Sequence, residues 1–503
     1  MSEVLRDGGP VETHAPVPAT PAGSKPLGGL VGAGLRWSLA TQVGLRAATF
    51  LSGVVLARIL VPEDFGVYAV ALAAINLLLS ISDAGLILAV IQWRGDLEEV
   101  KSTAFTLTLT VSVGLYLLCF ALAGPFAELM GSPQAVGVLR LMALAVVMDG
   151  FTAVPAATLH RAFRQDRMAI AELAAVPVNI GVSVVLAVLG AGAWSLAWGR
   201  LAGGLVSTSL VLLLASFRPR FGFDPALART LLRFGLPLAT TLLIEAALLN
   251  LDYVVVGHLL GPTALGFYLL AFNVSSWPIS VIRATVRRVS IAGFSRLQGD
   301  EEALAAGFAR SFGLLMTVTV PVALLLALLA PPLIRFVYGE RWSAAADVLR
   351  FLAVLGGVRV ATSLVFDVLV ASGRPRAPLW LQLTWLAALA PALVAGTRLD
   401  GIRGTAVAHA VVGITLVLPL FLLALRPLGV SLTRIARELA RPAAAALLAS
   451  IVCLGLLQAF RLPLAQLVVA GGGAASAYAL VVVPLDRIRH YLRRRASIPG
   501  RHA

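Results

Sequence analysis

The sequence has little charge for its length. Of its 503 residues, 13% are charged and 59% are hydrophobic, whereas soluble globular domains carry roughly 25% charged and 45–50% apolar residues. A soluble chain of this length would also divide into domains joined by polar linkers, and here the apolar runs continue almost to the C-terminal end. This composition excludes a soluble protein and predicts an all-α polytopic membrane protein.

Lysine, cysteine and histidine are also scarce. Lysine occurs only at Lys25 and Lys101, so the chain has no loop of the form G-x-x-x-x-G-K-[ST]. An ATP-driven transporter with its own nucleotide site is therefore excluded. The two cysteines, Cys119 and Cys453, lie inside apolar runs, and the six histidines are scattered. Neither pattern is that of a metal site or a disulfide framework, and we expect no cofactor.

Long runs with little or no charge fill most of the chain. A helix needs about 20 apolar residues to cross the hydrocarbon core of a bilayer. Fourteen runs meet that length: 35–60, 66–92, 102–124, 137–159, 168–189, 193–216, 234–257, 264–287, 311–332, 346–371, 377–396, 404–425, 442–460 and 463–485. The divisions at 190–192 and 461–462 are less sharp than the others, so twelve or thirteen spans are the alternatives.

The positive charges are distributed unevenly over these spans. With the N-terminus inside, 29 of the 40 cations fall on the cytoplasmic side and six on the outward side, in accord with the positive-inside rule. We therefore expect a multi-pass membrane protein with both termini cytoplasmic. The net charge of +15 then reports topology and does not predict nucleic-acid binding. The outward loops are short and carry few acids, which disfavours a membrane-embedded enzyme.

Two turns, after the first and seventh spans, have similar sequences. Residues 60–71 read L-V-P-E-D-F-G-V-Y-A-V-A, and residues 260–271 read L-G-P-T-A-L-G-F-Y-L-L-A. The identities are Leu60 with Leu260, Pro62 with Pro262, Gly66 with Gly266, Tyr68 with Tyr268 and Ala71 with Ala271. Proline and glycine suit any tight turn, which is the alternative explanation. Six intervening spans would make the halves parallel repeats, as in many transporters with a substrate site between the halves.

Polar residues follow one helical stripe on each of spans 1, 2, 7 and 8. A charge at the centre of a membrane helix costs about 2.5–3.5 kcal/mol, so such residues should face a cavity or a partner. We expect a central polar cavity between the halves, with these substrate-binding candidates: Arg46, Asp83, Glu245, Asn250, Asp252, Arg283 and Arg287. The alternative is purely structural, in which Arg46 pairs with Asp83 or Asp252. For the other buried charges we expect pairing within the membrane: Arg140, Asp149, Glu172, Arg200, Arg359 and Asp367.

Several segments resemble a known family. They are A-R-I-L-V-P-E-D-F-G-V-Y-A from Ala57 to Ala69, D-A-G-L from Asp83, N-L-D from Asn250, F-S-R-L-Q from Phe294 and Y-G-E-R-W from Tyr338. In order and spacing they resemble the Wzx-type oligosaccharide flippases of the multidrug/oligosaccharidyl-lipid/polysaccharide exporter superfamily. The resemblance covers about residues 30–485.

The resemblance implies two six-helix lobes around a cavity, with two further helices at the C-terminal end. Applied to this chain, it divides the sequence into a disordered cytoplasmic tail (1–30), an N-terminal lobe (31–217), a cytoplasmic linker (218–233), a C-terminal lobe (234–425), two extra helices (426–485) and a basic cytoplasmic tail (486–503). Members of this family move undecaprenyl-diphosphate-linked oligosaccharides from the cytoplasmic to the outer leaflet by alternating access.

This function would give the candidate residues distinct tasks. Arg46, Arg283 and Arg287 would hold the diphosphate, because a guanidinium binds phosphate oxygens in pairs and stays charged in apolar surroundings. Asp83, Glu245 and Asp252 would bind sugar hydroxyls or a coupling Na⁺ or H⁺. The expected partners are the lipid-linked oligosaccharide, membrane lipids, and the polymerase and chain-length regulator of an export system. The alternatives are a multidrug or organic-cation antiporter of the same superfamily and a membrane polysaccharide polymerase or ligase.

Overall fold

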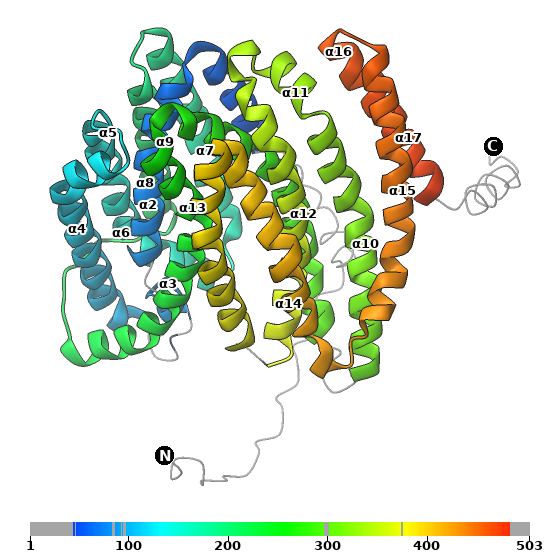
Figure 1. Ribbon diagram of the computed structural model, residues 1–503. Coiled ribbons are helices and arrows are strands. Elements are labelled where there is room, and N and C mark those ends of the chain that lie inside the picture. The colour runs from blue at the N-terminus through cyan, green and yellow to red at the C-terminus, as the bar shows by residue number, and fades with distance from the viewer. Residues whose placement is uncertain are drawn as a thin grey trace, which may run out of the picture. The chain divides into compact units, whose positions relative to one another are not determined.

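The computed structural model describes residues 44–45, 47–82, 86–91, 93, 97–295, 301–373 and 376–482. The chain divides into two compact units, Met1–Ala47 and Ala48–Ala503, and the architecture below is that of the second unit. Within the described ranges every regular element is a helix (Figure 1). The all-α polytopic fold expected from the composition is thereby confirmed.

The helices follow one another through short connections. The α-helices are α2 (Pro62–Ser82), α3 (Leu86–Ile91), α4 (Leu97–Leu129), α5 (Ala135–Met142), α6 (Leu144–Arg161), α7 (Gln165–Val188), α8 (Ala193–Leu214), α9 (Pro225–Ser295), α10 (Glu301–Leu328), α11 (Ala330–Val337), α12 (Ala344–Ala371), α13 (Arg376–Val412), α14 (Leu418–Leu423), α15 (Leu432–Ala459), α16 (Pro463–Ala465) and α17 (Gly471–Val482). Short 3-10 helices lie at Glu340–Trp342 and Arg426–Leu428, and π-helical segments at Gly413–Val417 and Gln466–Ala470.

Eleven helical segments of the described chain are long and apolar enough to span a membrane. The two less sharp divisions of the sequence both fall between helices, because α7 ends at Val188 before α8 begins at Ala193, and α15 ends at Ala459 before α16 begins at Pro463. A shorter apolar helix, Ala47–Ile59, covers part of the first predicted span.

Two of these segments each contain two predicted spans, because each reverses direction at a glycine. In α9, Gly261 has φ 78° and ψ −175°, and the Tyr268 hydroxyl donates a hydrogen bond to Asp252 at 2.9 Å. In an unbroken helix, residues this far apart in sequence would be separated by about 24 Å. In α13 the break lies at Asp400 and Gly401. We call the end of the helices that carries these turns the turn end, and the opposite end the basic end.

The repeated sequence packs against its own second copy at the turn end. A Cβ atom on Gly66 would lie 1.7 Å from the carbonyl oxygen of Pro262, and one on Gly266 would lie 1.9 Å from the carbonyl oxygen of Pro62. Each glycine therefore admits the backbone of the other copy, which no residue with a side chain could do. Along this contact α2 packs on α9, which joins the first half of the chain to the second.

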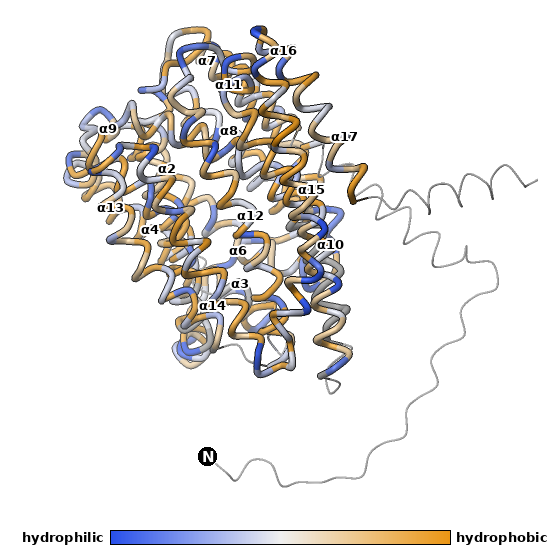
Figure 2. The backbone as a smooth tube through the Cα atoms, turned by 45° about the vertical axis from the view of Figure 1, so that its right-hand side comes forward, coloured by the Kyte–Doolittle hydropathy of each residue, from blue (hydrophilic) through white to orange (hydrophobic). Residues whose placement is uncertain are grey.

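Apolar side chains cover the outside of the helices. Leu117, Leu213 and Ile451 are 58%, 72% and 61% exposed, and Figure 2 shows hydrophobic residues along most of the length of the helices. Inside, one large cluster at the α2–α9 contact includes Trp342 and Tyr268. An apolar outer surface of this size is the surface that lipid covers.

Candidate functional site

The structure places the seven predicted site residues in different surroundings. Arg46 and Asp83 lie outside the described residues. Arg283 and Arg287 belong to the helical backbone of α9, and their side chains also lie outside the described part. Glu245 lies on an exposed face of α9. Asn250 and Asp252 are buried on the same helix, and the site is built around them.

Asn250 connects the two halves. Its side-chain oxygen accepts a hydrogen bond from Asn76 Nδ2 of α2 at 3.1 Å, and its own Nδ2 donates to the Ala246 carbonyl at 2.8 Å. The sequence places Asn76 on the polar stripe of the second predicted span and Asn250 next to that of the seventh, and this hydrogen bond joins the two spans. A buried amide that is satisfied in this way fixes the register of the two helices.

Asp252 lies at the centre of a buried polar cluster. The residue is fully buried; Tyr268 donates to its Oδ2 at 2.9 Å, and the Tyr253 backbone N–H donates to its Oδ1 at 3.0 Å. His409, equally buried on α13, has its Nδ1 atom 3.8 Å from Asp252 Oδ2. Among the described residues, neither ring nitrogen of His409 has a hydrogen-bond partner.

Arg359 of α12 adds a positive charge to this cluster. It interacts electrostatically with Asp252 and with His409, and its guanidinium carbon lies 5.2 Å from the centre of the Phe272 ring. In a low-dielectric interior, an arginine beside a carboxylate and an aromatic face keeps its charge at a tolerable cost. The cluster is therefore built from four helical segments: the two arms of α9, α12 and α13.

A small cavity opens beside Arg359. It has a volume of about 190 Å³, several times the roughly 30 Å³ that one water molecule occupies in the liquid. Its polar lining consists of Ser275, Ser276, Ser280 and Arg359, and its apolar lining includes Phe272. Hydroxyl groups and a guanidinium around an otherwise apolar hollow are suited to bind phosphate or sugar oxygens.

Sequence reasoning placed Arg359 among the paired charges and gave no role to His409 or Tyr268. One feature of the sequence could have pointed to Tyr268, because this residue belongs to the repeat. No such feature pointed to His409, because its neighbour Asp252 lies 157 positions earlier in the chain and meets it only through helix packing. The π-helical segment Gly413–Val417 that follows His409 on the same helix was also not predicted, and such segments are frequent at functional sites.

A buried tryptophan closes the turn end. Trp342 is fully buried and donates its Nε1–H to the Ala57 carbonyl at 2.8 Å. Its ring makes edge contacts with Phe65 and Phe267, at centroid distances of 5.0 and 5.9 Å. Phe65 lies in the first copy of the repeat and Phe267 in the second, so one side chain from the second half contacts both copies.

Two arginines reinforce this closure. Arg58 donates to the Val337 carbonyl at 2.8 Å and to the Phe336 carbonyl, and Arg341 donates to the Leu60 carbonyl at 3.2 Å. These bonds cross between the halves in both directions. We call residues 57–60 and 336–342 together the turn-end contact. Burial raises the pKa of Tyr338, so this tyrosine of the contact stays a neutral phenol.

Within the described residues there is no cluster of three or more His, Cys, Asp or Glu side chains that could hold a metal ion. The groups that the site does offer are a guanidinium and hydroxyls in a cavity, next to a buried carboxylate and imidazole.

Comparison with known proteins places this chain among polysaccharide biosynthesis proteins. Residues 55–347 match the model of a family described as polysaccharide biosynthesis protein. The chain is 29% identical to the succinoglycan biosynthesis transport protein ExoT of Rhizobium meliloti (strain 1021), over 73% of this chain and 74% of ExoT. It is 26% identical to the lipopolysaccharide biosynthesis protein WzxC of Escherichia coli (strain K12), over 74% and 76% of the two chains.

A solved structure shares the fold. The lipid II flippase MurJ, in an inward closed conformation, superimposes with a TM-score of 0.75 at 14% identity, covering 89% of this chain and 99% of MurJ. At this identity the likeness concerns the fold. Together with the family match, it confirms the resemblance to oligosaccharide flippases that the sequence motifs indicated.

Proposed function

The chain belongs to the family of polysaccharide biosynthesis proteins, and on that premise we propose that it is a flippase for an undecaprenyl-diphosphate-linked oligosaccharide. It carries this lipid from the cytoplasmic to the outer leaflet of the bacterial cell membrane by alternating access, as a transporter and not as an enzyme. The transport and biosynthesis names of ExoT and WzxC support the substrate class. The single observation that carries the proposal is the cavity of about 190 Å³ lined by Arg359 and three serines inside apolar helices.

The cargo combines a polar headgroup with a long prenyl chain. Arg359 holds phosphate oxygens, since a guanidinium can donate two parallel hydrogen bonds to them, and Ser275, Ser276 and Ser280 bind further oxygens of the headgroup. The prenyl chain stays in lipid. Arg46, Arg283 and Arg287 are proposed as further phosphate contacts, and Asp83 and Glu245 as contacts to sugar hydroxyls.

The orientation follows from the charges. The basic end, where most arginines lie, faces the cytoplasm together with both termini. The turn end then faces outward, and the turn-end contact is a closed outer gate. In this conformation the cargo enters from the cytoplasmic leaflet.

The transport proposal is tested with the purified full-length protein in proteoliposomes, using a fluorescent polyprenyl-diphosphate oligosaccharide that a membrane-impermeant reductant quenches in the outer leaflet. We expect Arg359→Gln to slow flipping at least tenfold and Arg359→Lys to slow it less, because the lysine retains the charge but not the paired hydrogen bonds. The matched control is Arg350→Gln, an exposed arginine on the same helix that pairs with Asp347 at 3.6 Å. Thermal unfolding checks that each variant is folded.

The opposite outcome is equally clear. If the wild-type protein leaves the lipid in place and instead exports an organic cation, the chain is an antiporter of the kind that the sequence analysis keeps as an alternative. Equal flipping by wild type and a folded Arg359→Gln variant would remove Arg359 from the binding site.

We also propose that a proton is the coupling ion and that Asp252 and His409 bind it. Protonation gives His409 a positive charge 3.8 Å from the Asp252 carboxylate. This charge partly neutralises the carboxylate, so the attraction between Asp252 and Arg359 weakens. Arg359 is released to hold an anion, so binding of the cargo strengthens as the pH falls. The other titratable groups that face the pair within the described residues are Tyr253 and Tyr268 of α9.

The proton proposal predicts a pH effect that one substitution removes. The wild-type affinity for the lipid rises as the pH falls through the range in which the Asp252–His409 pair takes up a proton, and His409→Gln makes this affinity nearly constant. His160→Gln, on an exposed surface at the end of α6, should keep the wild-type profile. An unchanged profile in a folded His409→Gln variant, measured as lipid affinity in detergent, would exclude this pair as the proton site.

A further inference from the structure

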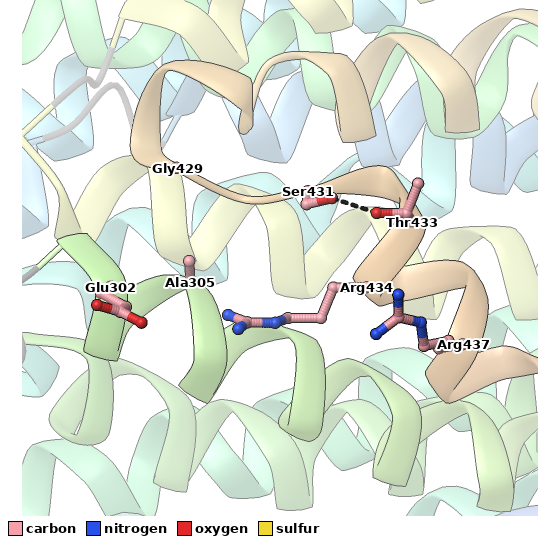
Figure 3. A pocket seen from close by; sticks show the side chains of 7 residues that line it. All are labelled: Glu302, Ala305, Gly429, Ser431, Thr433, Arg434 and Arg437. Carbon is pink, nitrogen blue, oxygen red and sulfur yellow. Dashed lines mark hydrogen bonds between the residues drawn. The ribbon is translucent and has the colours of Figure 1, made fainter.

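A second and larger cavity lies at the basic end, away from the site described above. It has a volume of about 480 Å³ and lies between the first turns of α10 and the start of α15. Its walls are Glu302 and Ala305 from α10, and Gly429, Ser431, Thr433, Arg434 and Arg437 from the connection into α15 (Figure 3). We call it the basic-end pocket.

The local backbone shapes this pocket. Gly429 has φ 72° and ends the 3-10 helix Arg426–Leu428, and Ser431 is extended before α15 begins at Leu432. The left-handed conformation of Gly429 ends this 3-10 helix and turns the chain toward α15 at the wall of the hollow. Ser431 Oγ and Thr433 Oγ1 lie 2.6 Å apart and form a hydroxyl pair at its rim.

Two arginines on one helix face supply the charge. Arg434 and Arg437 are three positions apart, so they project from the same side of α15, and in Figure 3 Arg434 extends across toward Ala305. Among the side chains that the structure describes, neither arginine has an ion pair; Glu302, on the opposite wall, lies beyond ion-pair distance of both. Two guanidiniums beside hydroxyl groups form a site suited to a phosphate group.

The depth of the pocket indicates a lipid. Arg434 and Arg437 occupy the first two turns of α15, a candidate membrane span. Further along the same helix, Leu447 is 65% exposed, and Leu314 of α10 is 70% exposed. Ten residues of helix separate Arg437 from Leu447, which is about 15 Å. A phosphate in the pocket would therefore sit at headgroup level, with attached hydrocarbon chains along the apolar surfaces.

We propose that the basic-end pocket binds the headgroup of a membrane lipid that carries a phosphate and free hydroxyl groups. Arg434 and Arg437 hold the phosphate, and the Glu302 carboxylate accepts hydrogen bonds from the headgroup hydroxyls. The carboxylate on the far wall repels a bare phosphate monoester, whose second charge it would face. A glycerol or sugar headgroup on a phosphate fits both walls. The site stands independently of the transport proposal, since it concerns binding and not movement.

Native mass spectrometry of the detergent-purified full-length chain tests the pocket. The probes are phosphatidylglycerol, phosphatidic acid, a polyprenyl-diphosphate oligosaccharide and inorganic phosphate. We expect the wild type to retain phosphatidylglycerol or the polyprenyl lipid and the double variant R434Q/R437Q to bind it at least tenfold more weakly. The matched control R218Q/R220Q loses the same two charges from an exposed part of the chain and should bind as the wild type does.

The probes separate the sources of the phosphate. Retention of phosphatidylglycerol identifies a bulk phospholipid as the ligand, and retention of the polyprenyl lipid alone identifies the cargo. Equal binding by the wild type and R434Q/R437Q overturns the proposal, as does wild-type binding of inorganic phosphate as strong as that of either lipid. If the double variant does not fold, Glu302→Gln is tested instead. We expect it to reduce severalfold the ratio of the affinity for phosphatidylglycerol to that for phosphatidic acid. An unchanged ratio would contradict the proposed binding site.

Discussion

At Gly66 and Gly266, the absence of a methyl group determines how closely the two halves approach. Replacing Gly66 by alanine places a methyl carbon 1.7 Å from the Pro262 carbonyl oxygen, so the backbones must move apart. Forced overpacking of this kind costs about 1–3 kcal/mol, which exceeds the roughly 1 kcal/mol that alanine gains over glycine in a helix. We therefore expect Gly66→Ala and Gly266→Ala to lower the thermal unfolding midpoint.

The control for this prediction is a glycine with free space around it. A Cβ atom on Gly114 of α4 would meet nothing within 4 Å, so Gly114→Ala should leave the unfolding midpoint unchanged or raise it slightly. If Gly66→Ala and Gly114→Ala behave alike in differential scanning fluorimetry, the close approach of the two repeat turns does not stabilise the protein.

At the scale of the elements, the connection between α11 and α12 is hydrogen-bonded to a helix of the other half. Trp342 lies in the 3-10 helix Glu340–Trp342 and reaches the helix Ala47–Ile59 through its bond to the Ala57 carbonyl. Trp342→Phe keeps an aromatic ring but removes that bond, which costs about 0.5–1.5 kcal/mol. If the bond exists only in the closed state, the population open at the turn end should rise about 2- to 13-fold.

The opening is measured by thiol labelling. Leu60, 3% exposed in the turn-end contact, is replaced by cysteine, and its rate of reaction with a bulky maleimide reports the open population. Trp380→Phe is the control, because Trp380 is 67% exposed and lies outside the contact. A labelling rate that Trp342→Phe leaves at the wild-type value would show that this tryptophan does not hold the end closed.

At the scale of the whole molecule, the spans were predictable and the site was not. A membrane span is a local property, because each run of apolar residues must satisfy its own backbone in lipid, and even the divisions before Ala193 and Pro463 appear as helix ends. The repeat could be recognised in the sequence, but the sequence did not predict that its two copies are in contact. The Asp252, Arg359 and His409 cluster forms from three helices, and no spacing in a single sequence encodes their packing. Roles for Arg46, Asp83, Arg283 and Arg287 stay predictions.

Alternating access requires the two halves to separate at the turn end during each cycle, and a cross-link tests that requirement. In a background with Cys119 and Cys453 replaced by alanine, Arg58→Cys and Val337→Cys place one thiol in each half, at positions joined by a 2.8 Å hydrogen bond in the closed state. A short bifunctional thiosulfonate should then stop flipping almost completely, and a reductant should restore it.

Glu63→Cys with Gln134→Cys is the matched control, because these residues are also in contact at the turn end, at 2.9 Å, but both belong to the first half. A rigid-body motion of the halves leaves that pair together, so its cross-link should be harmless. Continued flipping with the Arg58–Val337 pair linked would mean that cargo crosses without separation of the turn-end contact.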